Sequence, residues 1–236
     1  IKQEGALKNI PKGLNDLDIF TISLRPYNVT GIKNLRLFFN SDIFNISSDI
    51  LKVKSLGKLN DVIEDLYKEN KKVIFTMGKG GVGKTTTTVG LAQVLSVEFN
   101  KRVLVIDLDA QTNATTMLIG EDKWVEVNKQ KQTIAQLFYE GVYPRSEKIF
   151  DINRAILKSV SNIDEVKLVD ILPSSLDLID IQEEVIKTPR GIFSAIRPVD
   201  LLGKALQNIK QKYDYILIDC PPNLGVITRN GLKVSD

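Results

Sequence analysis

The chain has 236 residues, of which 43% are hydrophobic and 26% charged, a composition typical of a soluble globular protein with one α/β domain and an appendage. One cysteine and no histidine exclude a disulfide framework, a histidine zinc site and Ser-His-Asp or Cys-His catalysis. The net charge of +3 lies entirely in residues 1–72, and residues 73–236 are neutral, so bulk charge gives no support for nucleic-acid binding.

No apolar stretch is long enough to span a bilayer and no signal-peptide pattern opens the chain, so we expect no membrane association and a cytoplasmic location. The chain begins with Ile1 rather than Met and stops at Asp236, directly after a helix-like segment. We therefore expect a fragment that is truncated at its C-terminus.

Residues 1–72 are expected to form an N-terminal α/β extension. An Ile- and Phe-rich run predicts a strand over Leu17–Leu24. Apolar residues at helical spacing predict helices over residues 31–40 and over Leu59–Lys72.

Residues 73–236 alternate buried strands with amphipathic helices, which predicts a doubly wound, mostly parallel sheet with flanking helices. The helices are expected over Lys84–Phe99, Thr133–Tyr139, Leu176–Val185 and Val199–Gln211. The strands are expected over Val73–Met77, Arg102–Asp109, Lys167–Ser175 and Tyr213–Pro222.

The stretch VIFTMGKGGVGKTTTT (Val73–Thr88) meets the phosphate-binding pattern G-x-x-x-x-G-K-[ST] between a strand and a helix, and predicts a P-loop NTPase. Its backbone N–H groups and the helix N-terminus would cradle the phosphates of ATP. Lys84 would reach the β- and γ-phosphates and Thr85 would bind Mg²⁺. The alternative is a glycine-rich turn that binds nothing. The nucleotide-binding residues predicted are Gly78, Lys79, Gly80, Gly81, Val82, Gly83, Lys84, Thr85 and Thr86.

Carboxylates follow two of the predicted strands, where parallel sheets bind ligands. Asp219 in YILIDCPPNLG is the expected Walker B carboxylate, which would hold Mg²⁺ through water. Asp107 and Asp109 in DLDAQTNATT follow another strand, and the alternative for them is turn formation and helix capping. Cys220 is expected to be a buried packing thiol rather than a nucleophile.

The string GKGGVGKTT resembles the deviant Walker A box of the ParA/MinD/ArsA class of P-loop ATPases. The resemblance implies that Lys79 reaches across a dimer interface to the phosphates bound by the partner, as an arginine finger does in other NTPases. Taken alone, a lysine in a loop is more often a solvated side chain.

DLDAQTNATT is similar to the D-x-D-P-Q-x-N-x-T box of ParA/Soj-type partition ATPases, with Ala110 in place of the proline. The resemblance implies that Asp109 orients the attacking water and that Asp107 supports the Mg²⁺ shell. LPSSLDLID (Leu172–Asp180) and CPPNLGVITRNGLKVSD (Cys220–Asp236) resemble further segments of the same family, in the same order.

This resemblance implies a Mg²⁺-dependent ATPase that forms a homodimer on ATP binding, with Lys79, Lys84 and Asp109 catalytic and Thr85, Asp107 and Asp219 at the metal. A ParB-like activator and non-specific DNA, bound through regions beyond Asp236, are the implied partners, with a nucleoid-associated location and a role in chromosome or plasmid partitioning. A MinD-like membrane-recruited regulator is an alternative, which requires a C-terminal amphipathic helix.

The first 72 residues instead resemble the region between the two halves of the arsenite-pump ATPase ArsA, in the segment LDIFTISLRPYNVTGIKNLRLFFN. The two resemblances meet at GKGGVGKTTT, so the chain is interpreted as an ArsA-like head (1–72) joined to a ParA-like body (73–236), or as one divergent ATPase with an N-terminal extension. An ArsA-like pump subunit is a further alternative, which the single cysteine disfavours because a metalloid site needs several thiolates.

Overall fold

The computed structural model describes residues 66, 68, 71–78, 83–143, 146–187 and 197–236. The strand expected over Leu17–Leu24 and the helix expected over residues 31–40 lie outside the described residues. Of the helix expected over residues 59–72, Leu66 and Lys68 are described and helical, whereas Lys71 and Lys72 are not helical.

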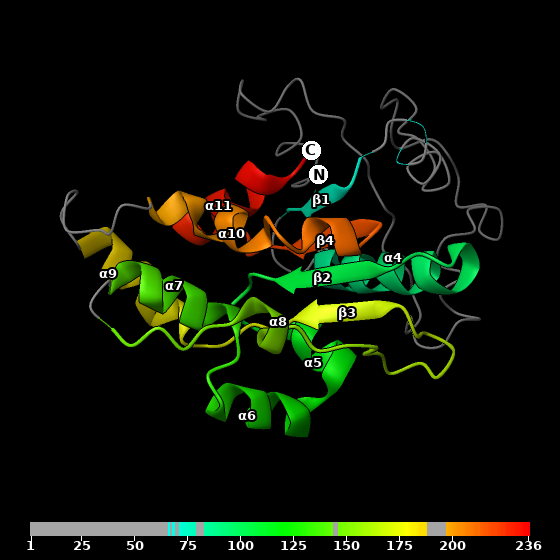
Figure 1. Ribbon diagram of the computed structural model, residues 1–236, viewed down its shortest axis with the longest axis horizontal. Helices are drawn as coiled ribbons and strands as arrows, with labels where there is room; N and C mark the ends of the chain where they lie inside the picture. Colours follow the sequence, from blue (N-terminus) through cyan, green and yellow to red (C-terminus); the bar gives the residue numbers. More distant parts are fainter. Residues whose placement is uncertain (1–65, 67, 69–70, 79–82, 144–145, 188–196) are drawn as a thin grey trace, which may run out of the picture.

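The centre of the fold is a four-stranded sheet that is parallel, as predicted, and its strand order is β1-β4-β2-β3 (Figure 1). Its strands are near-continuously apolar, as expected when helices cover both faces of a parallel sheet. Each strand is shorter than its predicted range, which loses residues at one or both ends. The strands are β1 (Val73–Thr76), β2 (Val103–Asp107), β3 (Val169–Leu172) and β4 (Tyr215–Asp219).

The side chains of each strand alternate between two hydrophobic clusters, one on each face of the sheet. On β2, Val103 and Val105 pack against helices α4 (Lys84–Phe99) and α5 (Asn113–Ile119), whereas Leu104 and Ile106 face the cluster on the other side. This two-sided burial confirms the doubly wound arrangement.

The opposite face is covered by α7 (Ile134–Val142), α9 (Leu178–Lys187), α10 (Leu201–Leu206) and α11 (Val226–Val234). The predictions over Lys84–Phe99, Thr133–Tyr139 and Leu176–Val185 are confirmed as helices, to within a few residues at their ends. No helix among the described residues is both long and apolar enough to cross a membrane.

The single helix predicted over Val199–Gln211 is wrong, because the segment breaks into three short pieces. Bonds from Ile209 N–H to the Leu206 carbonyl (3.0 Å) and from Lys212 N–H to the Ile209 carbonyl (2.9 Å) span three residues rather than four. The pieces are the 3₁₀ turn η3 (Pro198–Asp200), α10 and the 3₁₀ turn η4 (Lys210–Lys212). The sequence reading also missed α5, α6 (Glu121–Lys129) and the single-turn helix α8 (Ile152–Ala155).

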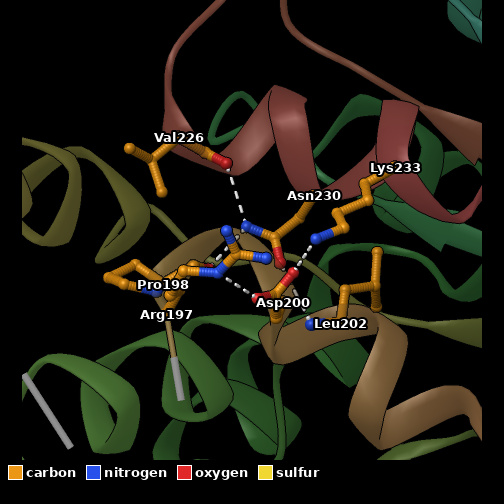
Figure 2. Close-up of polar contacts among 7 residues, drawn as sticks. All are labelled: Arg197, Pro198, Asp200, Leu202, Val226, Asn230 and Lys233. Carbon is orange, nitrogen blue, oxygen red and sulfur yellow. Dashed lines mark hydrogen bonds and ion pairs between the residues drawn. The ribbon is translucent and has the colours of Figure 1, made fainter. Parts of the chain in front are cut away.

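The amide of Asn230 ties α11 to the η3–α10 segment (Figure 2). The side chain is fully buried and accepts a hydrogen bond from Leu202 N–H at 3.1 Å. Its NH₂ group donates to the carbonyls of Pro198 (2.8 Å) and Val226 (2.9 Å). Because α11 begins seven residues after Asp219, the last residue of β4, this amide fixes the helix that follows the loop from β4.

Asp200 adds ion pairs to the same junction (Figure 2). It accepts from Arg197 Nε at 2.8 Å and pairs with Lys233 of α11. Since all three side chains are at least a quarter exposed, these pairs contribute less to stability than the buried amide does.

We expect Asn230→Ala to lower the free energy of unfolding by roughly 2–4 kcal/mol, because it leaves a backbone N–H and a carbonyl buried without partners. Urea unfolding measures the change. Gln211→Ala, at an exposed site, is the control and should change stability by less than about 0.5 kcal/mol. An Asn230→Ala protein as stable as the control would contradict this role.

Candidate functional site

The carboxyl ends of three adjacent strands bring the predicted site residues together. Thr76 of β1 lies in register with Asp219 of β4, and Asp219 lies in register with Asp107 of β2. Ligands bind at this edge of parallel α/β sheets because the connecting loops and helix N-termini converge there. The structure therefore places Asp107 and Asp219 at one edge, as predicted.

Helix α4 starts at this edge with Lys84 and Thr85 in its first turn. Gly83 precedes it with φ at 83° in the left-handed region, and a Cβ at that position would meet no atom within 4 Å. Glycine is thus required by the backbone conformation and not by space. The first N–H groups of the helix, including that of Thr86, have no partner within the helix, which suits an anion.

The structure describes only part of the predicted phosphate-binding loop. Gly78 is described, two residues beyond the end of β1. Lys79, Gly80, Gly81 and Val82 lie outside the described residues, so their roles stay predictions.

Asp219 and Thr85 form the oxygen pair at the centre of the site. The Thr85 hydroxyl donates to Asp219 Oδ2 at 2.6 Å. The other carboxylate oxygen, Oδ1, is buried and accepts no hydrogen bond from the residues that the structure describes. Burial raises the pKa of Asp219 to about 6, against the opposing effect of the Thr85 hydroxyl. A bound cation would stabilise a buried carboxylate that has an oxygen without a hydrogen-bond donor.

Asp107 is fully buried and accepts hydrogen bonds from the loop and the helix that follow β2. Its Oδ1 accepts from Asp109 N–H at 3.0 Å, and its Oδ2 accepts from the N–H and the hydroxyl of Thr115 at 2.9 and 2.7 Å. Burial, with the charge of Asp219 added, raises the pKa of Asp107 to about 7. Because its two oxygens already accept three hydrogen bonds, Asp107 is better suited to support the ligands of a metal ion than to bind the ion directly.

Asp109 is partly exposed and forms a turn, which is the alternative that its sequence context left open. Its Oδ1 accepts from Gln111 N–H at 3.0 Å, and its carbonyl accepts from Thr112 N–H at 2.9 Å. The charge of Asp109 also raises the pKa of Asp219, which shows that the two carboxylates are close. Turn formation and a role toward a ligand are therefore compatible at this position.

Three threonines that the sequence reading did not single out hold the site in place. Thr115 is buried and links Asp107 to the N–H of Ser174 after β3, at 3.0 Å. The Thr76 hydroxyl contacts that of Thr88 on α4 at 2.7 Å and donates to the Ile218 carbonyl at 2.9 Å. Thr115 lies in the segment DLDAQTNATT, but its hydrogen-bond partners could not be identified from the local sequence.

Thr112 adopts a backbone conformation that a β-branched residue rarely takes, with φ at 56°. It is the residue before α5, so this strained turn directs the chain from β2 into α5. Strained backbone of this kind is common in loops that line functional sites.

Cys220 is fully buried and free, and burial raises the pKa of its thiol well above the usual range. The prediction of a packing thiol is confirmed, since a thiol held protonated is a poor nucleophile.

The residues present fit a nucleotide with Mg²⁺. A hydroxyl and a carboxylate are the hard oxygen donors that Mg²⁺ prefers. Among the residues described, no three His, Cys, Asp or Glu side chains gather into a metal-binding cluster. Phosphate oxygens and water would therefore complete the coordination, as is usual for Mg²⁺ bound with phosphates.

Comparison with known proteins supports the same interpretation. A family model described as an AAA domain matches residues 70–236. The sporulation initiation inhibitor protein Soj of Bacillus subtilis is 37% identical over 166 residues, which are 70% of this chain and 55% of Soj. The chromosome partitioning protein ParA of Myxococcus xanthus is 30% identical over 158 residues, 67% of this chain and 47% of that protein.

Among solved structures, a plasmid partition protein from Borrelia burgdorferi superimposes with a TM-score of 0.50 at 30% identity, over 70% of this chain and 62% of that one. The chain spans about half the length of the curated relatives that it matches. Because the family model covers residues 70–236, the chain belongs to the AAA-domain family, and over this region it is similar to ParA/Soj-type partition ATPases.

Proposed function

We propose that this chain carries the nucleotide site of a ParA-type dimerisation switch, which binds and hydrolyses ATP with Mg²⁺ in chromosome or plasmid partitioning. The observation that carries the proposal is the oxygen pair of Thr85 and Asp219 beside the N-terminus of α4. Asp219 Oδ1 is buried there and has no hydrogen-bond donor among the described residues. The names of the relatives support the partitioning role.

In this proposal each residue of the nucleotide site has its own role in binding or hydrolysing ATP. The N–H groups of the first turn of α4 bind phosphate oxygens, and Lys84 neutralises their charge. Mg²⁺, when bound, withdraws charge from the phosphates and fixes their orientation. Thr85 and Asp219 hold that ion, and Asp107 keeps the loop that carries Asp109 against the site. Asp109 orients the attacking water.

Two parts of the proposal depend on residues outside the described structure or on other molecules. Lys79 acts across a homodimer interface, so that hydrolysis is coupled to assembly. A ParB-like protein stimulates hydrolysis, and DNA is the surface on which the dimer moves, in the cytoplasm on the nucleoid. Residues 1–72 are proposed to be a separate unit with ArsA-like sequence.

Lys84→Ala is expected to abolish nucleotide binding, with ATP affinity reduced at least about a hundredfold, because the charge-assisted bonds to two phosphates are lost. Calorimetric titration with ATP and Mg²⁺ measures the change. Lys129→Ala, which removes an exposed cation from α6, is the matched control. ATP affinity unchanged by Lys84→Ala would contradict the P-loop assignment and with it the proposed function.

Asp109→Ala and Lys79→Ala separate hydrolysis from assembly. Asp109→Ala should lower turnover by about 10²–10⁴-fold and keep ATP-dependent dimerisation, because only the water loses its orientation. Lys79→Ala should lower turnover by about 10³-fold or more and also abolish dimerisation, while ATP still binds. Phosphate release and light scattering measure the two properties. Wild-type turnover in either variant would remove that residue from the mechanism.

The Mg²⁺-dependent part of ATP affinity should disappear as the pH falls through about 6, the raised pKa of Asp219. The sign follows because a protonated carboxyl group cannot hold the cation, whereas the carboxylate above this pH can. ATP titrations at pH 5–8, with Mg²⁺ in large excess or with chelator, measure it. Asp219→Asn should lack this Mg²⁺ dependence at every pH. A Mg²⁺ effect as large at pH 5 as at pH 8 would refute the assignment.

A further inference from the structure

The hydroxyl of Thr115 connects two segments that lie far apart in the sequence. Thr115 is fully buried in the first turn of α5. Its hydroxyl bonds Asp107 at the end of β2, eight residues earlier, and the N–H of Ser174 after β3, 59 residues later. The hydroxyl of the next residue, Thr116, instead bonds the Thr112 carbonyl one turn back, as is common for threonine in helices. The contacts of Thr115 therefore serve the end of the sheet rather than its own helix.

These contacts determine where the hydroxyl proton of Thr115 points. The N–H of Ser174 is a donor, so at 3.0 Å it uses a lone pair of the Thr115 oxygen. The single proton of the hydroxyl is then donated to Asp107 Oδ2, at 2.7 Å. The same carboxylate oxygen accepts from the backbone N–H of Thr115 at 2.9 Å. One residue thus supplies two donors to one oxygen of Asp107.

Two donors from a single residue fix the orientation of the Asp107 carboxylate. While Oδ2 is held by Thr115, Oδ1 accepts from the N–H of Asp109 at 3.0 Å. Asp107 also lies in register with Asp219 on the neighbouring strand. A rotation of the Asp107 carboxylate would therefore disturb both the turn that carries Asp109 and the surroundings of Asp219.

The segment that donates to Thr115 is itself held by two helices. The indole N–H of Trp124 in α6 donates to the Ser174 carbonyl at 3.1 Å. The N–H of Ile134, the first residue of α7, donates to the Pro173 carbonyl at 2.8 Å. The Ser174 N–H is therefore a well-anchored donor, and it orients the hydroxyl of Thr115 from outside α5.

We propose that Thr115 is a positioning residue for the magnesium ion, an inference that rests on the proposed function of the site. Thr115 acts through Asp107, because its hydroxyl holds that carboxylate in the orientation in which it supports the ligands of the ion beside Asp219. This role requires no contact between Thr115 and the ion or the nucleotide. Removal of a hydrogen bond of this kind, behind the ligands of a metal, typically lowers metal affinity by about 10–100-fold.

The test compares, for the 236-residue chain, the Kd of ATP in chelator with the Kd of ATP in excess Mg²⁺, both by calorimetry. The ratio of the two Kd values measures how much Mg²⁺ strengthens binding. Thr115→Val keeps the side-chain shape and the backbone N–H, and should lower this ratio about tenfold. It should change the Kd in chelator by less than about twofold. Thr115→Ser restores the hydroxyl and should keep the ratio within about threefold of the wild-type value.

The matched control is Thr228→Val in α11. Thr228 is also fully buried, but its hydroxyl has no hydrogen-bond partner among the described residues. The same substitution there should change the ratio by less than about twofold. Thermal unfolding verifies that each variant is folded. If Thr115→Val does not fold, Thr115→Cys takes its place and should lower the ratio about threefold, because a thiol is a weaker donor and acceptor than a hydroxyl.

A ratio unchanged from wild type in Thr115→Val, or in Thr115→Cys where that variant is used, would overturn the proposal. Equal loss of ATP affinity with and without Mg²⁺ would overturn it too, because Thr115 would then only stabilise the fold. An equal reduction of the ratio in Thr228→Val would have the same meaning. A wild-type chain that binds ATP equally with and without Mg²⁺ would refute the metal site itself, and with it both this inference and the proposed function.

Discussion

The structure depends on two carboxylates held side by side at the end of a parallel sheet. Asp107 and Asp219 lie in register on β2 and β4, and both are almost completely buried. Two buried carboxylates raise each other's pKa and oppose folding unless donors or a cation compensate them. Asp107 has three hydrogen-bond donors, whereas one oxygen of Asp219 has no donor among the described residues. This incomplete compensation gives a divalent cation its favourable position, and it explains why the neighbouring loops are so closely tied to the two strands.

The hydrophobic clusters on both faces of the sheet hold the strand ends that carry these two carboxylates. Clusters on each side of β2 hold the strand rigidly, so that Asp107 and the first turn of α5 cannot move independently. α4 is anchored in the same way by buried Val89, Ala92 and Leu95, which fixes Thr85 against Asp219. Oxygens placed by a packed scaffold need no rearrangement to receive a ligand, and a preorganised site of this kind binds at lower cost.

The parts of this arrangement that could be predicted are those that local sequence encodes. Apolar runs identified the four strands, and the glycine pattern identified the start of α4 at Lys84, because both depend on residues close in sequence. The buried role of Asn230 could not be predicted, since it bonds backbone groups 28 and 32 residues away. The link from Thr115 to Ser174 spans 59 residues. The short helices α5, α6 and α8 were missed because each has too few turns for a clear apolar period.

The nucleotide site and helices α7 and α9 share one support, the segment that follows β3. Ser174 donates its N–H to the hydroxyl of Thr115, which in turn donates to Asp107. The next residue, Ser175, accepts a hydrogen bond from the N–H of Asp177, the residue before α9. α7 is held to the same strand end, because Ile134 N–H donates to the Pro173 carbonyl at 2.8 Å. The N-terminal ends of α7 and α9 are therefore both held at the end of β3.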